Sequence, residues 1–230
     1  MKSKHSIAGG AGAATPKKVF IVEDHPIFRE GLVQIINSEE DLTVCGEAED
    51  AEHALEAIPG LKPDLVLVDI SLPGKSGLEL IKDLRARKSG GKLLVLSMHD
   101  EALYADRVLR AGGDGYIMKE EDPEEVVHAI RDVLSGRIYV SEQVLAGGTK
   151  AAQARASKPK SRPLSQLTDM ELEVLELLGE GKTNFEIACQ LHIQPGKANA
   201  YCTQIKRKLN LKSLNALIRY AVCWVEGGKA

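Results

Sequence analysis

A run of four aliphatic residues that ends in a carboxylate, Leu65-Val66-Leu67-Val68-Asp69, constrains the fold of this chain more than any other stretch. A strand that is apolar on both faces is typical of the middle of a parallel sheet covered by helices. Ligands of such sheets bind at the carboxyl ends of the strands. The run therefore predicts a central, buried strand that places Asp69 at a ligand-binding edge.

Further apolar runs predict strands that end at the same edge, each followed by polar or charged side chains. Together with Asp69 they deliver three carboxylates, one hydroxyl and one ammonium group to one edge of the sheet. This convergence indicates a phosphoryl-transfer site, because phosphoryl transfer depends mostly on positioning and charge neutralisation. The runs and the side chains that follow them are residues 19–22 with Glu23 and Asp24, residues 93–96 with Ser97, and residues 115–118 with Lys119.

Between these strands the apolar residues recur at helical spacing, and residues 42–46 add another strand. A helix that begins at residue 51 is predicted to stop at residue 58, because Pro59 and Gly60 follow. Parallel strands joined by right-handed helical connections form a doubly wound sheet. For residues 17–141 we therefore predict an α/β fold, a doubly wound, five-stranded parallel sheet of the flavodoxin type.

The charged residues divide the chain into two parts. Residues 160–230 contain ten Lys or Arg and seven Asp or Glu, whereas the preceding residues contain twenty and twenty-six. This asymmetry predicts that only the carboxy-terminal part binds a polyanion. Residues 1–16 and residues 142–163 are poor in large apolar side chains, so we expect a flexible tail and a linker there.

Residues 164–230 predict a second, smaller, all-helical domain. Thr168 and Thr183 each precede a helical pattern and are followed three residues later by a Glu, as in a capping box. Residues 192–194 separate the second and third helices by a turn of helix-turn-helix length. The third helix carries polar side chains suited to base edges and, towards its end, cations suited to phosphates. These side chains are Lys197, Asn199, Thr203, Lys206, Arg207 and Lys208.

Neither the cysteines nor the apolar residues indicate an extracellular or membrane protein. The cysteines show no CxxC spacing, and we expect them to be buried in a protein of a reducing compartment. No apolar stretch approaches the roughly 20 residues that a membrane-spanning helix requires. We therefore predict a cytoplasmic protein with no membrane partner. The four cysteines are Cys45, Cys189, Cys202 and Cys223.

Three carboxylates at one edge are costly without a cation, because like charges a few ångström apart disfavour ionisation. Mg²⁺ suits these oxygens and commonly binds one or two carboxylates together with phosphate. Asp69 is the predicted nucleophile, since a carboxylate can accept a phosphoryl group as an aspartyl phosphate. We expect Asp24 and Glu23 to hold the metal or its waters, and Ser97 and Lys119 to hold the transferred oxygens.

The residues at this edge form a set: Glu23-Asp24-His25-Pro26, Asp69 with Leu72-Pro73-Gly74 and Gly77, Ser97, and Gly115-Tyr116-Ile117-Met118-Lys119. This set resembles the receiver domain of two-component response regulators. The resemblance implies that a histidine kinase phosphorylates Asp69 and that Asp24, Asp69 and the main-chain carbonyl of Ser71 bind Mg²⁺. It also implies that Ser97 moves towards the new phosphoryl group and that Tyr116 changes rotamer when Ser97 moves. In that family, side chains at positions like Ser71 and His99 tune the lifetime of the phosphoryl group.

A second set lies in the carboxy-terminal part: Leu167-Thr168, Glu173-Val174-Leu175, Leu178, Gly181, Asn184, Glu186-Ile187-Ala188, Leu191, Ile193 and Lys208-Leu209. It resembles the DNA-binding domain of the LuxR/NarL/FixJ type, in which part of the last helix forms a dimer face. The family usually enters its third helix with Ser-x-x-Thr-Val-Lys-x-His, but residues 194–201 here are Gln-Pro-Gly-Lys-Ala-Asn-Ala-Tyr. Two cations of the family are thus missing from the reading face, although Lys197 can supply one. The DNA contacts that the resemblance implies are Thr183, Asn184, Asn199, Ala200 and Thr203.

We therefore predict a phosphorylation-controlled, DNA-binding transcription regulator and not an enzyme. Phosphorylation is expected to promote dimerisation or to expose the DNA-binding domain. The expected partners are a histidine kinase, duplex DNA and a second copy of the chain. The alternative is a phosphosignalling receiver whose atypical helical tail binds a protein in place of DNA. Salt-dependent binding of duplex DNA separates the two, because contacts with phosphates weaken steeply as ionic strength rises.

Overall fold

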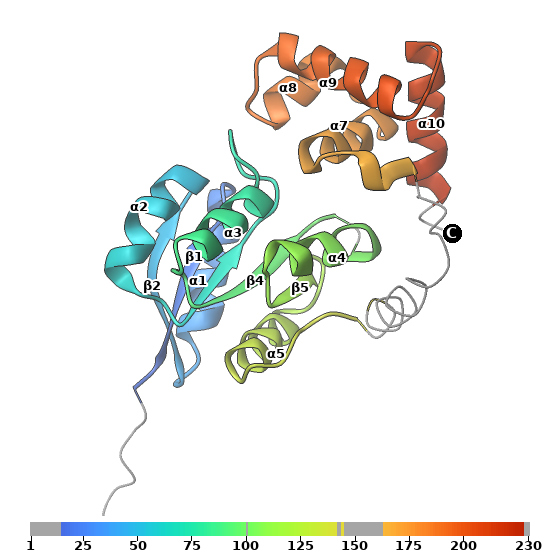
Figure 1. The fold of residues 1–230 in the computed structure, drawn as a ribbon. Coiled ribbons are helices and arrows are strands. Elements are labelled where there is room, and N and C mark those ends of the chain that lie inside the picture. Colours follow the sequence, from blue (N-terminus) through green and yellow to red (C-terminus); the bar gives the residue numbers. More distant parts are fainter. Residues whose placement is uncertain (1–14, 100, 142–143, 145–162, 228–230) are drawn as a thin grey trace, which may run out of the picture.

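The structure, a computed structural model, describes residues 15–99, 101–141, 144 and 163–227. A domain built on a parallel sheet is followed by a helical domain (Figure 1). Most of the predicted tail at residues 1–16 and of the predicted linker at residues 142–163 lies outside the described residues.

Five parallel strands form the sheet, in the order β2-β1-β3-β4-β5. The prediction of a doubly wound, five-stranded parallel sheet is therefore confirmed. The chain crosses from β1 to β2 on one side and then to β3 on the other, so a crevice opens at the carboxyl ends of β1 and β3. The strands are β1 (Lys17–Val22), β2 (Leu42–Ala48), β3 (Leu65–Val68), β4 (Lys92–Ser97) and β5 (Gly115–Met118).

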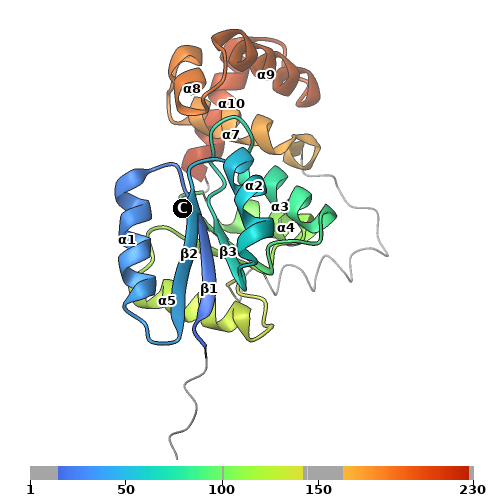
Figure 2. The ribbon, with the colours of Figure 1, turned by 90° about the vertical axis from the view of Figure 1, so that its left-hand side faces the viewer.

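Helices cover both faces of the sheet (Figure 2). On one face lie α1 (Pro26–Asn37) and α5 (Pro123–Leu134). On the other face lie α2 (Ala51–Leu61), α3 (Gly77–Ala86) and α4 (Glu101–Ala111). Every residue of β3 is buried, as its apolar run predicts, because both faces are covered.

The predicted end of α2 at residue 58 is wrong, because the helix continues through Pro59 and Gly60 to Leu61. Pro59 has no N–H to donate to the carbonyl of Leu55, which normally disfavours proline inside a helix. Here Nη1 of Arg87 donates to that carbonyl at 3.3 Å. The helix ends after Leu61 because the next residue, Lys62, adopts a left-handed conformation with φ of 48°.

The helical domain contains η2 (Pro163–Gln166), α7 (Asp169–Gly179), α8 (Asn184–Gln190), α9 (Pro195–Lys208) and α10 (Leu214–Gly227). Both predicted capping boxes are present, at Thr168 with Glu171 and at Thr183 with Glu186. A turn in which His192 has a φ of 50° joins α8 to α9. This pair of helices is the predicted helix-turn-helix unit.

All four cysteines are free, but the prediction that they are buried is wrong for Cys189 and Cys223, which are exposed. Cys189 follows the buried Ala188 by one position, and Cys223 follows the buried Ala221 by two. Steps of about 100° per residue along a helix turn these side chains away from the core. Within the described ranges, no helix combines the length and the apolar character needed to cross a bilayer.

Candidate functional site

The side chains that follow β1, β3 and β5 meet at the crevice. Nζ of Lys119 lies 2.8 Å from Oδ2 of Asp69 and 2.6 Å from Oε2 of Glu23. The side chains of all three residues are at most 5% exposed. The ring of Phe28, which sequence reasoning missed, lies against the same ammonium, 4.8 Å from Nζ to its centroid. A buried cation therefore joins the predicted nucleophile to one predicted metal ligand.

For both Glu23 and Lys119, burial shifts the pKa in one direction and the oppositely charged neighbour shifts it in the other. Burial raises the pKa of Glu23, and the neighbouring Asp69 carboxylate raises it further, against the opposing effect of Lys119. Burial alone would lower the pKa of Lys119, but Asp69 and Glu23 raise it above its usual value. Lys119 therefore carries a positive charge at neutral pH, next to the carboxylate of Asp69.

The carboxylates at this edge fit a divalent cation. Glu23, Asp24, His25 and Asp69 each offer a ligand atom, and these atoms all lie within 4.8 Å of one another. Oδ1 of Asp24 is buried and accepts no hydrogen bond. Nδ1 of His25 lies 2.8 Å from this oxygen but directs its hydrogen bond to Glu23. A buried carboxylate oxygen without a hydrogen bond beside two further carboxylates is a donor set that suits Mg²⁺.

The loop after β3 is built closely around Asp69. The backbone N–H of Ser71 donates to Oδ1 of Asp69 at 3.2 Å, and the backbone N–H of Gly77 donates to the carbonyl of Ile70 at 2.8 Å. A Cβ atom at Gly77 would lie 2.0 Å from the backbone oxygen of Asp69. The sequence marked Gly77 as part of a tight loop, and this close approach of two backbone segments is the physical reason.

Ser97 and Tyr116 both contact the backbone of His99. The hydroxyl of Ser97 is fully buried and accepts a hydrogen bond from the N–H of His99 at 3.2 Å. The hydroxyl of Tyr116, whose side chain is also buried, donates to the carbonyl of His99 at 2.5 Å. The proposed movements of Ser97 and Tyr116 on phosphorylation stay predictions.

The helical domain contacts the sheet domain through α7, and sequence reasoning did not identify this contact. Nδ1 of His99 donates to Oε2 of Glu176 at 2.8 Å. Arg107 on α4 donates to Oδ1 of Asp169 at 2.9 Å and to the carbonyls of Leu164 and Leu167. We call these contacts, together with the apolar contacts around them, the docked interface.

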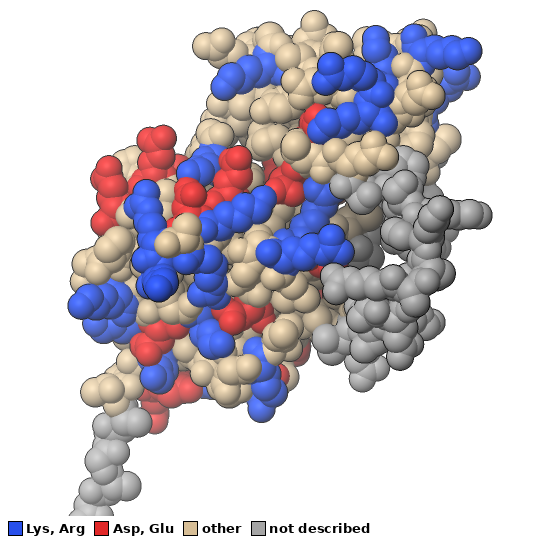
Figure 3. All heavy atoms as spheres, in the orientation of Figure 1, with Lys and Arg blue, Asp and Glu red and all other residues tan. Residues whose placement is uncertain are grey.

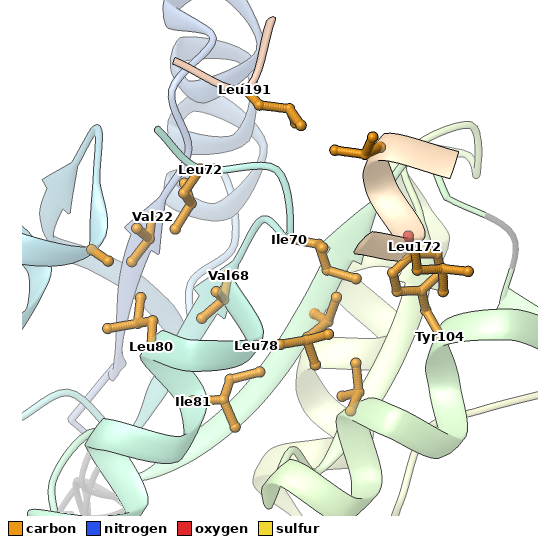
Figure 4. Packing of buried hydrophobic residues seen from close by; sticks show 14 of the residues in the cluster. Val22, Val68, Ile70, Leu72, Leu78, Leu80, Ile81, Tyr104, Leu172 and Leu191 are labelled. Atoms are coloured by element: carbon orange, nitrogen blue, oxygen red, sulfur yellow. The ribbon is translucent and has the colours of Figure 1, made fainter. Parts of the chain in front are cut away.

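A single cluster of buried hydrophobic residues runs through both domains. Figure 4 shows Leu172 of α7 beside Tyr104 of α4. Leu191, from the turn after α8, belongs to the same cluster as Leu72, which lies in the loop after Asp69. His192 extends this side of the interface, with Nε2 lying 4.0 Å from Oδ2 of Asp24. The helical domain therefore lies over the rim of the candidate site.

The predicted reading face of α9 points to solvent. The buried residues of α9, on the opposite side of the helix, are Ala198, Cys202 and Ile205, and they face the core of the helical domain. Figure 3 shows both signs of charge on the sheet domain but mostly Lys and Arg on the visible face of the helical domain. The exposed residues of α9 that were predicted to contact DNA are Lys197, Asn199, Ala200, Thr203 and Arg207.

Of the four remaining predicted DNA contacts, three have side-chain partners within the helical domain. Lys208 binds the carboxylate of Glu171 at 2.5 Å. Asn184 is half-buried, and its side-chain oxygen accepts a hydrogen bond from Cys202. The hydroxyl of Thr183 takes part in its capping box, although the residue is exposed. Lys206 is half-buried at the end of α9. Arg207 is therefore the exposed member of the cationic cluster at residues 206–208.

Known proteins resemble both parts of the chain. Residues 19–131 match the family described as response regulator receiver domain, and residues 165–221 match the bacterial regulatory proteins of the luxR family. The nitrate/nitrite response regulator protein NarL of Escherichia coli K12 is 33% identical over 201 residues, which cover 86% of this chain and 91% of NarL. The DNA-binding transcriptional activator DevR/DosR of Mycobacterium tuberculosis is 35% identical over 197 residues, covering 85% of this chain and 89% of DevR/DosR.

One similar solved structure is RcsB from Salmonella enterica serovar Typhimurium, bound to promoter P1flhDC in the presence of the phosphomimetic BeF3−. It has a TM-score of 0.60 and 26% sequence identity, and the match covers 90% of this chain and 98% of that one. The similarity therefore extends over both domains.

Proposed function

Because the chain belongs to the response regulators that join a receiver domain to a LuxR-type DNA-binding domain, we propose that phosphorylation of Asp69 controls its action as a transcription regulator. The observation that carries the proposal is the buried ammonium of Lys119, 2.8 Å from Oδ2 of Asp69. A fixed cation at this point stabilises the negative charge of a transferring phosphoryl group.

Each residue of the site has a separate role in this proposal. A carboxylate oxygen of Asp69 attacks the phosphorus atom of a phosphohistidine on the kinase, and the bond from phosphorus to the histidine nitrogen breaks. Lys119 and the hydroxyl of Ser97 bind oxygens of the transferred group. Asp24, Asp69 and the carbonyl of Ser71, with Glu23 close by, would hold Mg²⁺, whose chemistry is to neutralise charge on the phosphoryl oxygens.

Phosphoramidate, a small phosphodonor, tests the receiver without requiring the cognate kinase. In the presence of Mg²⁺, we expect intact mass spectrometry to detect one added phosphoryl group on the full chain. Asp69→Ala should abolish the addition, and Lys119→Ala should slow it strongly. Removal of Mg²⁺ by a chelator should have the same effect as loss of the acceptor.

Asp106→Ala is the matched control, because Asp106 is a carboxylate on the exposed surface of α4, with a side chain that is 64% exposed. It should leave the labelling unchanged. Undiminished labelling of the Asp69 variant would refute the proposed acceptor.

We propose duplex DNA as the ligand of the helical domain, read by α9. The support is an exposed polar face on the third helix of a helix-turn-helix unit, together with the RcsB structure, whose description names promoter DNA. Asn199 can pair with adenine, and Arg207 lies where a phosphate contact is expected. Because the reading face is already exposed in the docked arrangement, we propose that phosphorylation acts chiefly by freeing the helical domain to pair with a second copy.

Selection from a random duplex library by the phosphorylated chain tests this half of the proposal. We expect a recovered sequence motif and gel retardation that weakens as salt increases. Asn199→Ala should relax the preference at one position of the motif. Failure of any DNA to bind at low salt would favour the alternative, in which the atypical third helix binds a protein.

A histidine kinase, a second copy of the chain and a cytoplasmic location complete the proposal. Two exposed free thiols, at Cys189 and Cys223, suit a reducing compartment. Analytical ultracentrifugation with and without phosphoramidate measures the expected shift from monomer to dimer.

A further inference from the structure

A chain of hydrogen bonds leads from the acceptor carboxylate into the helical domain. The N–H of Ser71 donates to Oδ1 of Asp69 at 3.2 Å. The hydroxyl of Ser71 lies 2.8 Å from Nε2 of His99, and Nδ1 of the same ring lies 2.8 Å from Oε2 of Glu176. Since Glu176 belongs to α7, the chain begins at the phosphorylation site and ends in the other domain.

The imidazole of His99 is held in one position along this chain. Its ring stacks on Tyr104, with 4.6 Å between the centroids and 25° between the planes. The hydroxyl of Tyr104 donates to Oε2 of Glu176 at 3.3 Å, the oxygen that His99 also binds. The side chains of His99 and Glu176 are only 14% and 17% exposed. Both ring nitrogens and one ring face are therefore engaged, and Glu176 contributes to two of these contacts.

Both oxygens of the acceptor are occupied in this arrangement. Oδ1 accepts from the N–H of Ser71, and Oδ2 binds Lys119. A phosphoryl group must form a bond to one of these oxygens and must fit beside its present partner, so the surroundings of that oxygen have to make room for it. The backbone of Lys119 directly follows β5 and donates its N–H to the carbonyl of Ser97 at 2.8 Å, whereas Ser71 lies in a loop. The loop at Ser71 is therefore the part that can adjust more easily, and it is the part bonded to His99.

We propose that Glu176 of the DNA-binding domain is a positioning residue for the phosphorylation site: through His99 it holds Ser71 in the arrangement of the empty acceptor. This inference rests on the proposed phosphorylation of Asp69 and adds its regulation by the second domain. While the domains are docked, Glu176 restrains the loop and slows phosphorylation. Release of the helical domain removes the restraint, so pairing of two released helical domains on DNA would favour the phosphorylated state.

The test compares the initial rate at which phosphoramidate and Mg²⁺ label the full chain. In this reaction an oxygen of Asp69 bonds to phosphorus, the P–N bond breaks, and ammonia leaves with a proton from solvent. Glu176→Ala should label about fivefold faster than the wild type, which is the effect of one hydrogen bond. Glu176→Gln should stay near the wild-type rate, because its amide oxygen still accepts from Nδ1. Glu180→Ala, an exposed carboxylate at the end of α7, is the control and should change nothing.

Two further measurements separate positioning through His99 from a general effect on structure. His99→Ala should give the same acceleration as Glu176→Ala, and the double variant should be no faster than either single variant. Without Mg²⁺ or phosphodonor, hydrogen exchange of the backbone around Ser71 should be faster in Glu176→Ala than in Glu180→Ala. If Glu176→Ala does not fold, Glu176→Asp, whose carboxylate is one methylene shorter, replaces it with the same expectation.

The outcomes are distinguishable. If the wild type gains no phosphoryl group, or if Asp69→Ala is labelled equally, the proposed function fails. If the wild type is labelled on Asp69 but Glu176→Ala is labelled at the same rate or more slowly, only the role of Glu176 is overturned. Additive effects of His99→Ala and Glu176→Ala would also overturn it.

Discussion

Glu171 is a buried carboxylate that depends on a single cation. Its side chain is 1% exposed, and Oε2 binds Nζ of Lys208 and the N–H of Thr168. Its other oxygen, Oε1, is buried without a hydrogen bond. Burial alone would raise the pKa of Glu171, but Lys208 and Thr168 lower it below its usual value. The stabilisation by Lys208 is therefore fully present at neutral pH and is lost only as the pH falls through that lowered pKa.

Lys208→Ala should therefore destabilise the helical domain more than it weakens DNA binding. We expect the free energy of unfolding to fall by about 2 kcal/mol, because a buried carboxylate loses its charged partner. Arg207→Ala, on the exposed side of α9, is the matched control and should change stability little. Trp224, the one tryptophan of the chain, lies in α10 and reports urea unfolding of this domain by fluorescence. Equal losses in the two variants would contradict the assignment of Lys208 to Glu171.

Gly77 is a position where one added methyl group should disable the receiver. A Cβ atom there would lie 2.0 Å from the backbone oxygen of Asp69, so the acceptor segment must move. We expect Gly77→Ala to slow labelling by phosphoramidate about tenfold or more, because phosphoryl transfer requires exact placement of the acceptor. Stability should fall by about 2 kcal/mol, as in other overpacked sites. Gly60→Ala is the control, since nothing lies within 4 Å of the added atom.

At the scale of the element, the sequence predicted the features that depend on neighbours along the chain. The strands follow from their apolar runs, and the starts of α7 and α8 follow from the capping boxes at Thr168 and Thr183. The end of α2 could not be predicted in this way. Pro59 is tolerated because Arg87, twenty-eight residues further along, supplies the donor that Leu55 would otherwise lack.

For helix α9, too, the sequence predicted only part of what the structure shows. The sequence places the cationic cluster at residues 206–208 near the end of this helix, where the structure has it. The sequence of this helix does not show that Lys208 is bound while Arg207 is exposed, because the partner of Lys208 is Glu171 in α7. A pattern on one helix predicts which cations are available but not which are already bound by another helix.

The salt dependence of DNA binding measures how many cations of α9 contact phosphates. Each phosphate contact contributes about 0.9 to the slope of log K against log salt concentration. Arg207→Ala should therefore reduce the slope by about one and weaken binding to all sequences alike. Gel retardation of the selected duplex over a series of salt concentrations gives both quantities. An unchanged slope would place Arg207 away from the DNA backbone.

At the scale of the whole molecule, the docked interface joins residues that are far apart in the sequence. His99 meets Glu176 across 77 residues, and Arg107 meets Asp169 across 62. Each of these side chains, considered alone, has the pattern of a solvated helix or loop residue. The meeting of Glu23, Asp69 and Lys119 was predicted because parallel strands bring their carboxyl ends to one edge of a sheet. No comparable rule specifies how two domains joined by a linker dock.

Glu173 makes the docked interface sensitive to pH. Its side chain lies on α7, is 2% exposed, and has one oxygen without a hydrogen bond. Burial, helped by the charges of Asp169, Asp69 and Glu176 and opposed by His99, raises the pKa of Glu173 to about 8. The docked state therefore keeps a proton on Glu173 at neutral pH. A released α7 would return this carboxyl to water, where its pKa is near the usual 4.5.

Docking should consequently weaken as the pH rises from about 4.5 to about 8, because the docked state binds more protons than the released state in this range. Small-angle scattering of the unphosphorylated chain should show a larger radius of gyration at pH 9 than at pH 6. Glu173→Gln, neutral at both pH values, should remove most of this change and remain compact. Burial would lower the pKa of His99, but Glu176 raises it above its usual value. Docking therefore also favours the protonated form of His99, so in Glu173→Gln a smaller increase in the radius of gyration with pH should remain. An equal expansion of the wild type and of Glu173→Gln would show that Glu173 does not control docking.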